Sequence, residues 1–431
     1  MHFHASDHTY DVLVCGAGIA GLASARALSD LGLHVLVVDG QRTPPDTARG
    51  EVLQPGALRV LRCWGAERLL RERGAVQLDR LVVREADGSE LLALDYGHLP
   101  EGDQQLLVHE HLAIQTALTD GLGPRVEIRR GTPVRQALRD SAGRVIGLRL
   151  EHRDRTIDVW APLVVAADGI ASRLRRTAGI RARHTTYPHR LLALEFNAPS
   201  SLPTDFSAYR TSRGLRLTYP LPRGRGRVYL QTSPHELRGL RHDHLTRWAI
   251  QALEEVPPLR ALVPLVPDAL AQRQLFTPRG FVTDQLVVPG MALVGEASYA
   301  MHPMAAQGMN LAVTSAAALA DQIGRHLGDR NRGRGHGPLA TGAVDAAFAA
   351  YQAGQLPALA RTAHISAGAA HLVTDLSQPG RLAGRRTLRR TDTNPRFSYQ
   401  ATRNLAGVDP EPFSTLDRLR QIGLLPLPDR S

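Results

Sequence analysis

The stretch Tyr10–Asp39, YDVLVCGAGIAGLASARALSDLGLHVLVVD, decides the fold. Its apolar run Val12–Cys15 predicts a buried strand, which stops at the first of three glycines spaced G-x-G-x-x-G. Alanine and leucine residues then continue as a helix that Gly32 ends, and the apolar run His34–Val38 predicts a second strand. The stretch therefore predicts a strand–helix–strand unit of the kind that binds a dinucleotide.

Each glycine of this turn has its own physical reason. Gly16 permits the tight turn, Gly18 lets a pyrophosphate approach the backbone amides and the positive end of the helix dipole, and Gly21 lets the helix pack closely on the strand. Asp39 lies at roughly the twenty-residue offset where a carboxylate can bind both hydroxyls of an adenosine ribose. We expect a bound dinucleotide rather than an ordinary glycine turn, but this unit leaves FAD and NAD both open.

The composition bounds the class of protein. A chain of 431 residues predicts about two or three domains, and 43% hydrophobic with 22% charged residues is typical of a globular protein. We expect a cytoplasmic protein without a membrane span, because the first residues hold no apolar signal core and no segment offers about eighteen apolar residues. Cys15 and Cys63 are the only cysteines, so a disulfide framework is not expected.

The net charge of +11 comes entirely from arginine, because the chain contains no lysine. The arginines are not interleaved with aromatic residues in one patch, so we do not expect nucleic-acid binding. A mild attraction for anionic cofactors is the more useful consequence. Mechanisms that need a lysine Schiff base or a lysine acid are excluded.

The rest of the chain divides by the spacing of its apolar residues. We expect a β-hairpin at Asp79–Tyr96 and a buried strand at Pro162–Ala166, and between about His184 and Gly280 an antiparallel sheet with one covered face. Within that sheet, Leu215, Leu217 and Tyr219 should face one side, and Arg216 and Thr218 the other. Helices are expected at Gln54–Trp64, Glu110–Leu122, Ala306–Leu327 and Ala343–His371, followed by an arginine-rich tail.

Two later motifs indicate a flavin. The first is Asp168–Arg175, a D-G-x-x-S-x-x-R sequence after a buried strand, and the second is Gly295–Asn310, GEASYAMHPMAAQGMN, between a strand and a long helix. At these motifs the chain resembles the class A flavoprotein monooxygenases, the group typified by para-hydroxybenzoate hydroxylase. The ubiquinone-biosynthesis hydroxylases, with their HPxxGQGxN-like segment, look most similar. The resemblance runs over nearly the whole chain and rests on three motifs in the family's order.

The resemblance implies an α/β fold: an FAD-binding Rossmann-like domain of the glutathione reductase type 2 class, an inserted antiparallel-sheet substrate domain and a helical C-terminus. Residues 1–77, 101–183 and 281–330 would form the FAD-binding domain. Residues 78–100 and 184–280 would form the substrate domain. Residues 331–431 would be a linker, a long helix and a C-terminal tail.

The resemblance also implies roles for individual residues in binding FAD. The early turn would cradle the pyrophosphate, with Asp39 on the ribose and Arg49 beside the flavin. The later motifs would reach the pyrophosphate and NAD(P)H (Asp168, Gly169), the ribityl chain (Gly295, Glu296) and the flavin pyrimidine. The implied residues of the early turn are Gly16, Ala17, Gly18, Ile19, Ala20 and Gly21, and those along the pyrimidine are Ala305, Ala306, Gln307, Gly308 and Met309.

Three residues depart from the family pattern. Glu296 stands where the family has aspartate, so the carboxylate is one methylene longer. Ala306 replaces the usual glycine before Gln307 and should crowd the flavin slightly. His109 stands where many members have arginine, and we still count it among the cofactor-binding residues.

The implied reaction uses NADH or NADPH to reduce FAD, after which O2 adds at C4a and the hydroperoxide hydroxylates a small hydrophobic or aromatic substrate. The substrate would lie between the inserted sheet and the flavin, beside Met301–Met304. No catalytic residue can be assigned; Arg49, Tyr299 and His302 are candidates, although packing explains Tyr299 and His302 better. Asp168 has a simpler interpretation as a helix cap, and we expect no metal site at His2, His4 and His8.

Other functions remain open on the same fold. Alkene epoxidation, Baeyer–Villiger insertion and saturation of a prenyl chain would use the same cofactor, and a non-enzymatic FAD-binding sensor would use no substrate. A halogenase is disfavoured because no lysine exists to carry the halogen. The identity of the substrate and the oligomeric state do not follow from the sequence.

Overall fold

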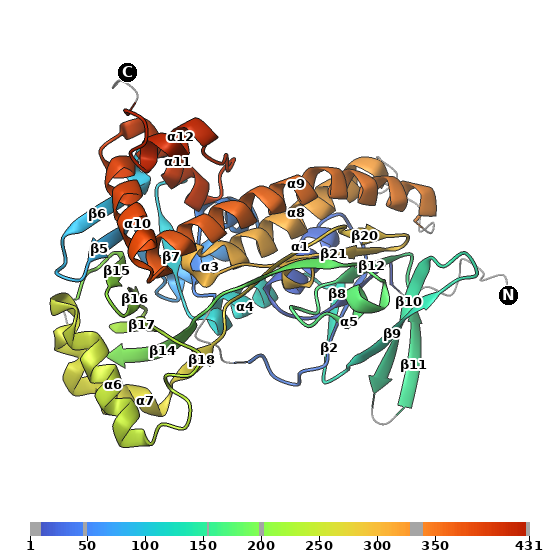
Figure 1. The fold of residues 1–431 in the computed structure, drawn as a ribbon. Helices are drawn as coiled ribbons and strands as arrows, with labels where there is room; N and C mark the ends of the chain where they lie inside the picture. The colour runs from blue at the N-terminus through green and yellow to red at the C-terminus, as the bar shows by residue number, and fades with distance from the viewer. Residues whose placement is uncertain (1–9, 46–49, 153–154, 198–201, 328–338, 428–431) are drawn as a thin grey trace.

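A six-stranded sheet grows from the predicted strand–helix–strand unit and lies at the centre of the molecule (Figure 1). The computed structural model describes residues 10–45, 50–152, 155–197, 202–327 and 339–427. All neighbouring strands of this sheet are parallel except the last pair at one edge. In spatial order the strands are β20 (Val287–Val288), β21 (Met291–Leu293), β12 (Leu163–Ala166), β1 (Val12–Cys15), β2 (Val35–Asp39) and β8 (Val126–Arg130).

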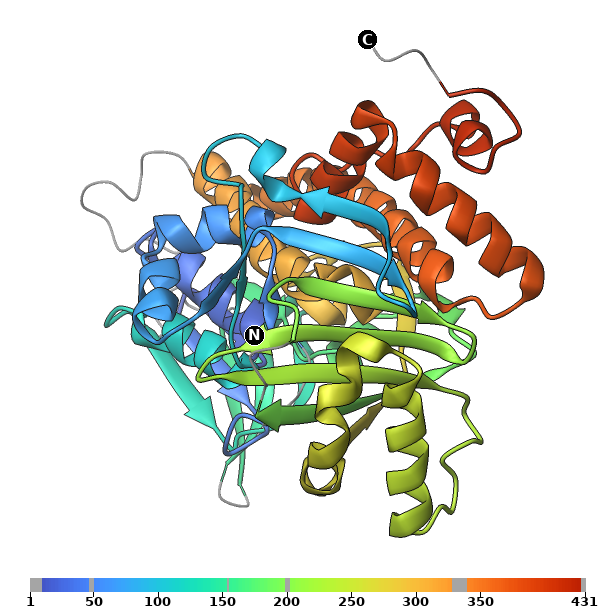
Figure 2. The same ribbon diagram turned by 90° about the vertical axis from the view of Figure 1, so that its left-hand side faces the viewer.

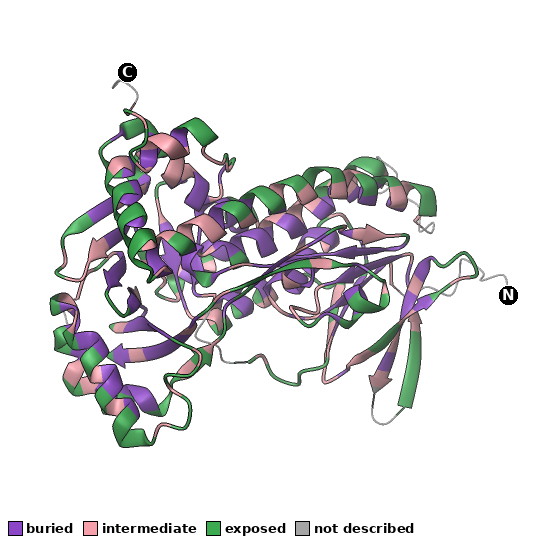
Figure 3. Cartoon of the chain, in the orientation of Figure 1, coloured by how far each residue is buried: buried purple, intermediate pink, exposed green. Residues whose placement is uncertain are grey.

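The four central strands β21, β12, β1 and β2 are buried on both faces apart from Asp39, which explains why they read as continuous apolar runs. Val12 and Val14 of β1 pack into a core with the helices on one face, and Leu13 and Cys15 pack into a second core on the other face. Figure 3 shows the resulting buried centre. The helices that contribute to the first core are α1 (Ile19–Ser29), α2 (Pro55–Cys63), α3 (Ala66–Glu72), α4 (His111–Asp120), α8 (Gln307–Leu327) and α9 (Thr341–Thr374).

A second, seven-stranded sheet lies beside the first. The predicted hairpin belongs to it, because its first strand pairs in parallel with a strand more than a hundred residues later, while every other pair is antiparallel. In spatial order the strands are β18 (Gln274–Phe276), β14 (Arg190–Asn197), β17 (Arg225–Thr232), β16 (Gly214–Leu221), β15 (Phe206–Thr211), β5 (Arg80–Glu85) and β6 (Glu90–Asp95).

The prediction that only one face of this sheet is covered is wrong. Leu215, Leu217 and Tyr219 do share one face, which we call the inner face, but Arg216 on the outer face is only 1% exposed. The guanidinium of Arg216 donates to the carbonyl of Ala252 at 3.0 Å. The outer face is covered by α6 (His242–Glu254), the 3-10 segment η2 (Pro257–Leu265) and α7 (Val266–Ala271) (Figure 1).

Three small sheets and several short segments complete the fold. The strands are β11 (Arg155–Trp160), β10 (Val145–His152) and β9 (Val134–Arg139) in one sheet, β13 (Ala182–Thr186), β19 (Arg279–Thr283) and β22 (Tyr299–Ala300) in another, and β3 (Val52–Leu53), β7 (Leu106–Val108) and β4 (Val76–Leu78) in the third. The short helical segments are η1 (Tyr96–His98), α5 (Arg173–Thr177), η3 (Gly295–Ala297) and η4 (Pro303–Ala305).

The residues after α9, expected as an arginine-rich tail, instead form three helices. They are α10 (Gln378–Asp392), α11 (Pro395–Ala406) and α12 (Thr415–Gln421). α10 and α11 lie beside the edge strand β6 (Figure 2), where Asp392 accepts the backbone N–H of Ala93 at 2.9 Å, and α12 packs on α10. These helices therefore protect an edge that would otherwise be free to pair with another chain.

The structure leaves two further expectations untested. The predicted linker around residues 329–337 lies outside the described residues. The division into six segments also stays a prediction. Among the helices of the described ranges, none combines the length and the apolar character needed to cross a membrane.

Candidate functional site

The early turn, Gly16–Gly21, has the geometry that its three glycines predict. Gly16 adopts a φ of +107°, and a Cβ atom there would overlap the carbonyl oxygen of Ala167 on the neighbouring strand connection. A Cβ atom at Gly21 would overlap the carbonyl oxygen of Gly16. At Gly18, in contrast, no atom lies within 4 Å of where a Cβ would be. Two glycines therefore serve close packing, and the third leaves open space in front of the helix.

That open space faces the start of α1. Gly18 is the N-cap residue, and no side chain caps the helix. The first amides of an uncapped helix lack intrahelical partners and carry the positive end of the helix dipole, so they favour an anionic group. Ile19 and Ala20 form the first turn of this helix.

Asp39 lies beside the same turn. Its carboxylate oxygens accept the backbone N–H of Ala17 and of Gln41, each at 2.7 Å. The carboxylate is partly exposed at the end of β2. Asp39 is thus held next to the early turn.

The late segment, Gly295–Asn310, packs directly against α1. Gly295 has a φ of +57°, and a Cβ atom there would overlap the side chain of Ala20. Glu296 follows on η3 and is partly exposed. Gly16, which opens the early turn, and Gly295, which opens the late segment, are nearly 280 residues apart in sequence. The two segments are nevertheless in contact.

The bend at the start of α8 is fixed by hydrogen bonds within the late segment and by one from Gln307 to the carbonyl of Leu405 at 2.6 Å. The fully buried Gln307 donates to the carbonyl of Ala305 at 3.1 Å and accepts from Asn310 at 3.1 Å. Tyr299 donates to the carbonyl of Gly308 at 2.8 Å. Ala306 and Gly308 themselves are partly or fully exposed, while Ala305 and Met309 are buried. The bend therefore presents backbone to open space while its side chains anchor it.

Ala306 has an unusual backbone conformation. Its φ of 50° and ψ of 31° place it in the left-handed region, which glycine adopts freely and alanine does not. The side chain of Ala306 is expected from the sequence to crowd the flavin. The structure adds a second consequence of the missing glycine, which is backbone strain.

The loop before β3 also reaches the bend. A Cβ atom at Gly50 would lie 3.5 Å from the side chain of Met309. Arg49, the preceding residue, lies outside the residues that the structure describes, as do His2, His4 and His8. Within the described ranges, no cluster of three or more His, Cys, Asp or Glu side chains is arranged to hold a metal ion.

Asp168 binds the first backbone amides of α5, whose N-cap residue is Ser172. Its Oδ2 accepts the backbone N–H of Arg173 at 2.8 Å and of Leu174 at 3.2 Å, while Oδ1 is buried without a hydrogen-bond partner among the described residues. Gly169 follows with a φ of +75°. Arg175, the last residue of the motif, donates to the carbonyl of Ala297 at 2.8 Å and so links this motif to η3.

His109 is buried beside β7, and its Nδ1 also lies against the carboxylate of Glu110. It is 2% exposed, its Nδ1 accepts the backbone N–H of Glu110 at 2.8 Å, and its Nε2 lies 3.3 Å from the carbonyl of Arg73. Burial lowers the pKa of the imidazole below its usual value. His109 therefore packs as an uncharged residue next to β7.

A buried charged network, which the sequence analysis missed, connects the Gly50 loop to the inner face of the seven-stranded sheet. Glu51 is 2% exposed and accepts two hydrogen bonds from the guanidinium of Arg227, at 2.6 and 3.0 Å. The hydroxyl of Tyr219 donates to the same carboxylate at 2.8 Å. Burial and the nearby Glu51 raise the pKa of Tyr219 well above its usual value, so its hydroxyl stays protonated. No local pattern marks Glu51, since its partners are 168 and 176 residues away.

The network extends along the sheet. Arg227 also pairs with Glu195 at 3.0 Å, Glu195 pairs with Arg225 at 2.7 Å, and Arg225 pairs with Glu110. Three carboxylates thus surround two guanidinium groups on this part of the inner face. An anionic ligand would find no unpaired arginine within this network.

Tyr299 and His302, the catalytic candidates in the late segment, are both buried. Tyr299 is fully buried, and burial raises its pKa well above the usual value. His302 is 1% exposed, and its Nε2 lies 2.9 Å from Nε2 of His189, which directly precedes β14. These contacts fit the packing interpretation that the sequence favoured.

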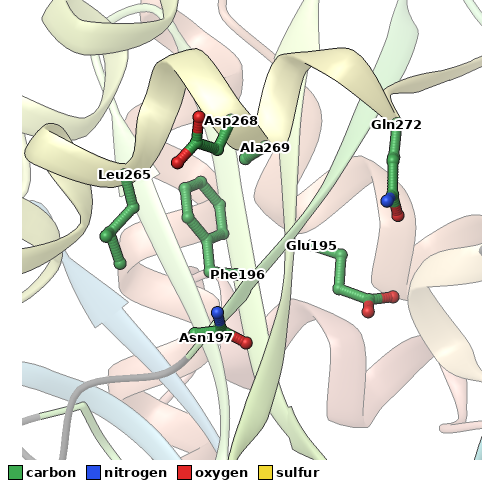
Figure 4. A pocket seen from close by; sticks show the side chains of 7 residues that line it. All are labelled: Glu195, Phe196, Asn197, Leu265, Asp268, Ala269 and Gln272. Carbon is green, nitrogen blue, oxygen red and sulfur yellow. The ribbon is translucent and has the colours of Figure 1, made fainter.

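A pocket of about 190 Å³ lies elsewhere, between the end of β14, η2 and α7 (Figure 4). Glu195 is one of its lining residues and belongs to the charged network. None of the lining residues belongs to the early turn or the late segment. They are Glu195, Phe196, Asn197, Leu265, Asp268, Ala269 and Gln272.

Comparisons with known proteins agree with this geometry. A family profile described as "FAD binding domain" matches residues 9–336. The chain is 31% identical over 330 residues to 6-methylpretetramide 4-monooxygenase of Streptomyces rimosus, covering 72% of this chain and 74% of that protein. It is 27% identical over 340 residues to ubiquinone hydroxylase UbiL of Rhodospirillum rubrum, covering 74% and 73%.

A solved structure has a similar fold. The crystal structure of PqsL from Pseudomonas aeruginosa superposes with a TM-score of 0.70 at 25% identity, covering 84% of this chain and 96% of that one.

Proposed function

This chain belongs to the FAD-binding domain family and is an FAD-dependent monooxygenase, and from that premise we propose that it hydroxylates a small hydrophobic or aromatic substrate. One observation carries the proposal. The open space at Gly18 and the exposed bend at Ala306–Gly308 lie on two segments that pack against each other through Gly295 and Ala20. A dinucleotide that spans from the early turn to the bend fits this arrangement.

The residues present fit FAD. The uncapped amides of α1 would receive the pyrophosphate, Asp39 the ribose, Glu296 the ribityl chain, and the bend at Gln307–Met309 the pyrimidine edge of the flavin. Bound FAD takes electrons from NADH or NADPH and activates O2 for transfer of one oxygen atom. The amides at the start of α8 would favour the negative charge that collects at the pyrimidine edge on reduction.

The inner face of the seven-stranded sheet supports an apolar substrate. Met304 and Ala305 of the late segment share one core with the apolar side chains of that face. The two arginines of the network are already paired with Glu51, Glu195 and Glu110. Side chains at this position favour an uncharged ligand over a carboxylate. The members of this core that come from β14, β16 and β17 are Leu191, Ala193, Leu215, Leu217, Tyr219, Leu221 and Tyr229.

The test uses the purified protein reconstituted with FAD. We expect yellow protein that oxidises NADH or NADPH, with O2 consumption stimulated by uncharged phenols or apolar alkenes. Mass analysis of the product distinguishes the outcomes, because a hydroxylase or an epoxidase adds one oxygen atom and a prenyl reductase adds two hydrogen atoms. A protein that stays colourless after reconstitution contradicts the proposal, and binding without any substrate-stimulated O2 consumption favours the sensor.

Two predictions of the sequence complete the proposal. A cytoplasmic location would be tested by fractionating cells that express the protein. The absence of nucleic-acid binding would be tested by a filter-binding measurement at low salt, because any arginine-driven attraction is strongest there.

A further inference from the structure

Two buried histidines join the late segment to the seven-stranded sheet. Nε2 of His189 lies 2.9 Å from Nε2 of His302, and the two rings meet nearly edge-on with centroids 5.1 Å apart. The ring of Tyr187 packs against His302 at 4.7 Å and against His189 at 6.0 Å. His189 is 4% exposed and His302 is 1% exposed. A polar contact so well shielded from water has to be internally satisfied.

The partners of the two rings decide which nitrogen carries each proton. Nδ1 of His302 accepts the backbone N–H of Met304 at 3.2 Å, so the proton of this neutral imidazole must be on Nε2. That Nε2–H donates to Nε2 of His189, whose own proton is therefore on Nδ1. Burial keeps both rings neutral, since it lowers the pKa of His302 to about 3 and that of His189 to about 4.

This arrangement leaves His302 without a site for proton transfer. One of its nitrogens accepts a backbone amide and the other donates to His189. A general base needs a lone pair within reach of the substrate, and His302 offers none while these bonds persist. The pair is therefore structural in character, and the question is which part of the molecule it holds in place.

The part that it holds is the turn that leads into the bend. His302 is the N-cap of η4, whose C-cap is the strained Ala306 directly before Gln307. The carbonyl of His302 also accepts from Ser366 of α9 at 3.4 Å. The turn is thus tied to α9 on one side and, through His189, to the start of β14 on the other.

We propose that His189 is a positioning residue for the flavin: by accepting the hydrogen bond of His302, it fixes the position of the Met301–Ala306 turn relative to the sheet. This inference rests on the proposed function, in which the flavin lies along Ala305–Met309. Loss of the acceptor leaves a buried donor unpaired, and the turn relieves this by moving away from the sheet. The flavin then loses part of its contact with the bend.

The experiment measures FAD affinity by quenching of flavin fluorescence, together with the visible absorbance spectrum of the bound flavin. His189→Leu should weaken FAD binding by about tenfold and shift the flavin bands. His189→Gln keeps an acceptor at similar reach and should stay within about twofold of the wild type. His189→Asn has the same amide one methylene shorter, so it should fall between the two.

His184→Leu is the matched control. This exposed histidine of β13 also packs against an aromatic ring, that of Phe281, which itself pairs with Ala300, but His184 is not part of the His189–His302 hydrogen bond. It should leave FAD affinity and spectrum unchanged. If His189→Leu does not fold, the FAD affinities of His189→Gln and His189→Asn still test the inference. The two amide side chains have the same polarity and differ only in length.

Two results can be told apart. Wild-type protein that fails to bind FAD overturns the proposed function and this inference with it. Wild-type protein that binds FAD, with Leu, Asn and Gln variants of equal affinity and identical spectra, overturns the role of His189 alone.

Discussion

At the scale of single residues, the glycines of the early turn differ in what a side chain would meet. Gly16 and Gly21 face backbone atoms at overlap distance, and Gly18 faces nothing within 4 Å. The backbone of Gly18 is also extended, with a φ of −78°, which any residue adopts. The three positions should therefore respond differently to substitution.

Gly18→Val should fold and lose its cofactor. The new side chain enters open space, so the melting temperature of the FAD-free protein should match that of FAD-free wild type, while the purified protein is colourless. Gly21→Val should instead prevent folding, since its side chain would overlap the carbonyl of Gly16. Full yellow absorbance in Gly18→Val would count against the cofactor assignment.

Ala306→Gly should stabilise the protein by about 0.5–1 kcal/mol, against the usual cost of such a change. Relief of the left-handed strain, about 1–2 kcal/mol for an L-residue, outweighs the extra backbone entropy of glycine. Ala317→Gly, in the interior of α8, is the matched control and should destabilise by about 1 kcal/mol. Urea unfolding of both variants measures the change in the free energy of unfolding, which should be positive for Ala306→Gly and negative for Ala317→Gly. Equal destabilisation of both variants would contradict the strain at Ala306.

At the scale of elements, one buried ion pair connects the loop before β3 to strand β17. Glu51 and Arg227 lie on different layers of the molecule and are each less than a tenth exposed. Such a pair costs desolvation energy that the mutual attraction must offset, so removing one partner is more harmful than removing both.

Arg227→Met should therefore destabilise the protein by about 3–5 kcal/mol, because the carboxylate of Glu51 stays buried with its main partner gone. The double variant Glu51→Gln with Arg227→Met should recover most of that loss. Arg149→Met breaks the exposed pair with Asp158 and should leave the free energy of unfolding nearly unchanged, because solvent screens this pair. Denaturant unfolding at neutral pH measures all three, and equal losses in the single and double variants would contradict the argument.

At the scale of the whole molecule, the two large sheets are joined at separate places. The Glu51–Arg227 pair joins the Gly50 loop to β17, and the His189–His302 pair joins the late segment to the start of β14. Both joints are polar and buried, and the histidine joint makes the stability of the whole chain depend on pH.

The histidine joint predicts a loss of stability in mild acid. Both rings are neutral in the folded state, with pKa values of about 4 and about 3, and the unfolded chain binds protons near the ordinary histidine pKa of about 6.5. The stability that they contribute is thus fully present above about pH 6.5 and is lost as pH falls toward 4. Each contributes a slope of up to about 1.4 kcal/mol per pH unit in that window.

Denaturant unfolding between pH 7.5 and 5 measures this slope. The double variant His189→Leu with His302→Leu should have a shallower slope than the wild type, and the neutral His109 accounts for part of what remains. Equal slopes in the two proteins would show that these rings do not stay neutral in the folded state.

The sequence by itself determined the central unit and its function. The glycine spacing, the apolar runs beside it and Asp39 are local, so a reader of Tyr10–Asp39 obtains β1, α1 and β2 within a few residues. The two later motifs, in the family's order, indicated that the bound dinucleotide is FAD and not NAD. The contact of Asp168 with the turn that follows it was also a local expectation, although the N-cap residue of α5 is Ser172.

Only the tertiary structure decided what depends on distant partners. Local hydropathy correctly split Leu215 and Arg216 between two faces of a sheet, but whether the second face was covered depended on α6, some thirty residues later. The strain at Ala306, the burial of Glu51 and the pairing of His189 with His302 likewise arise where separate segments pack together. A sequence specifies such contacts only through the whole fold, because burial is a property of neighbours and not of a residue type.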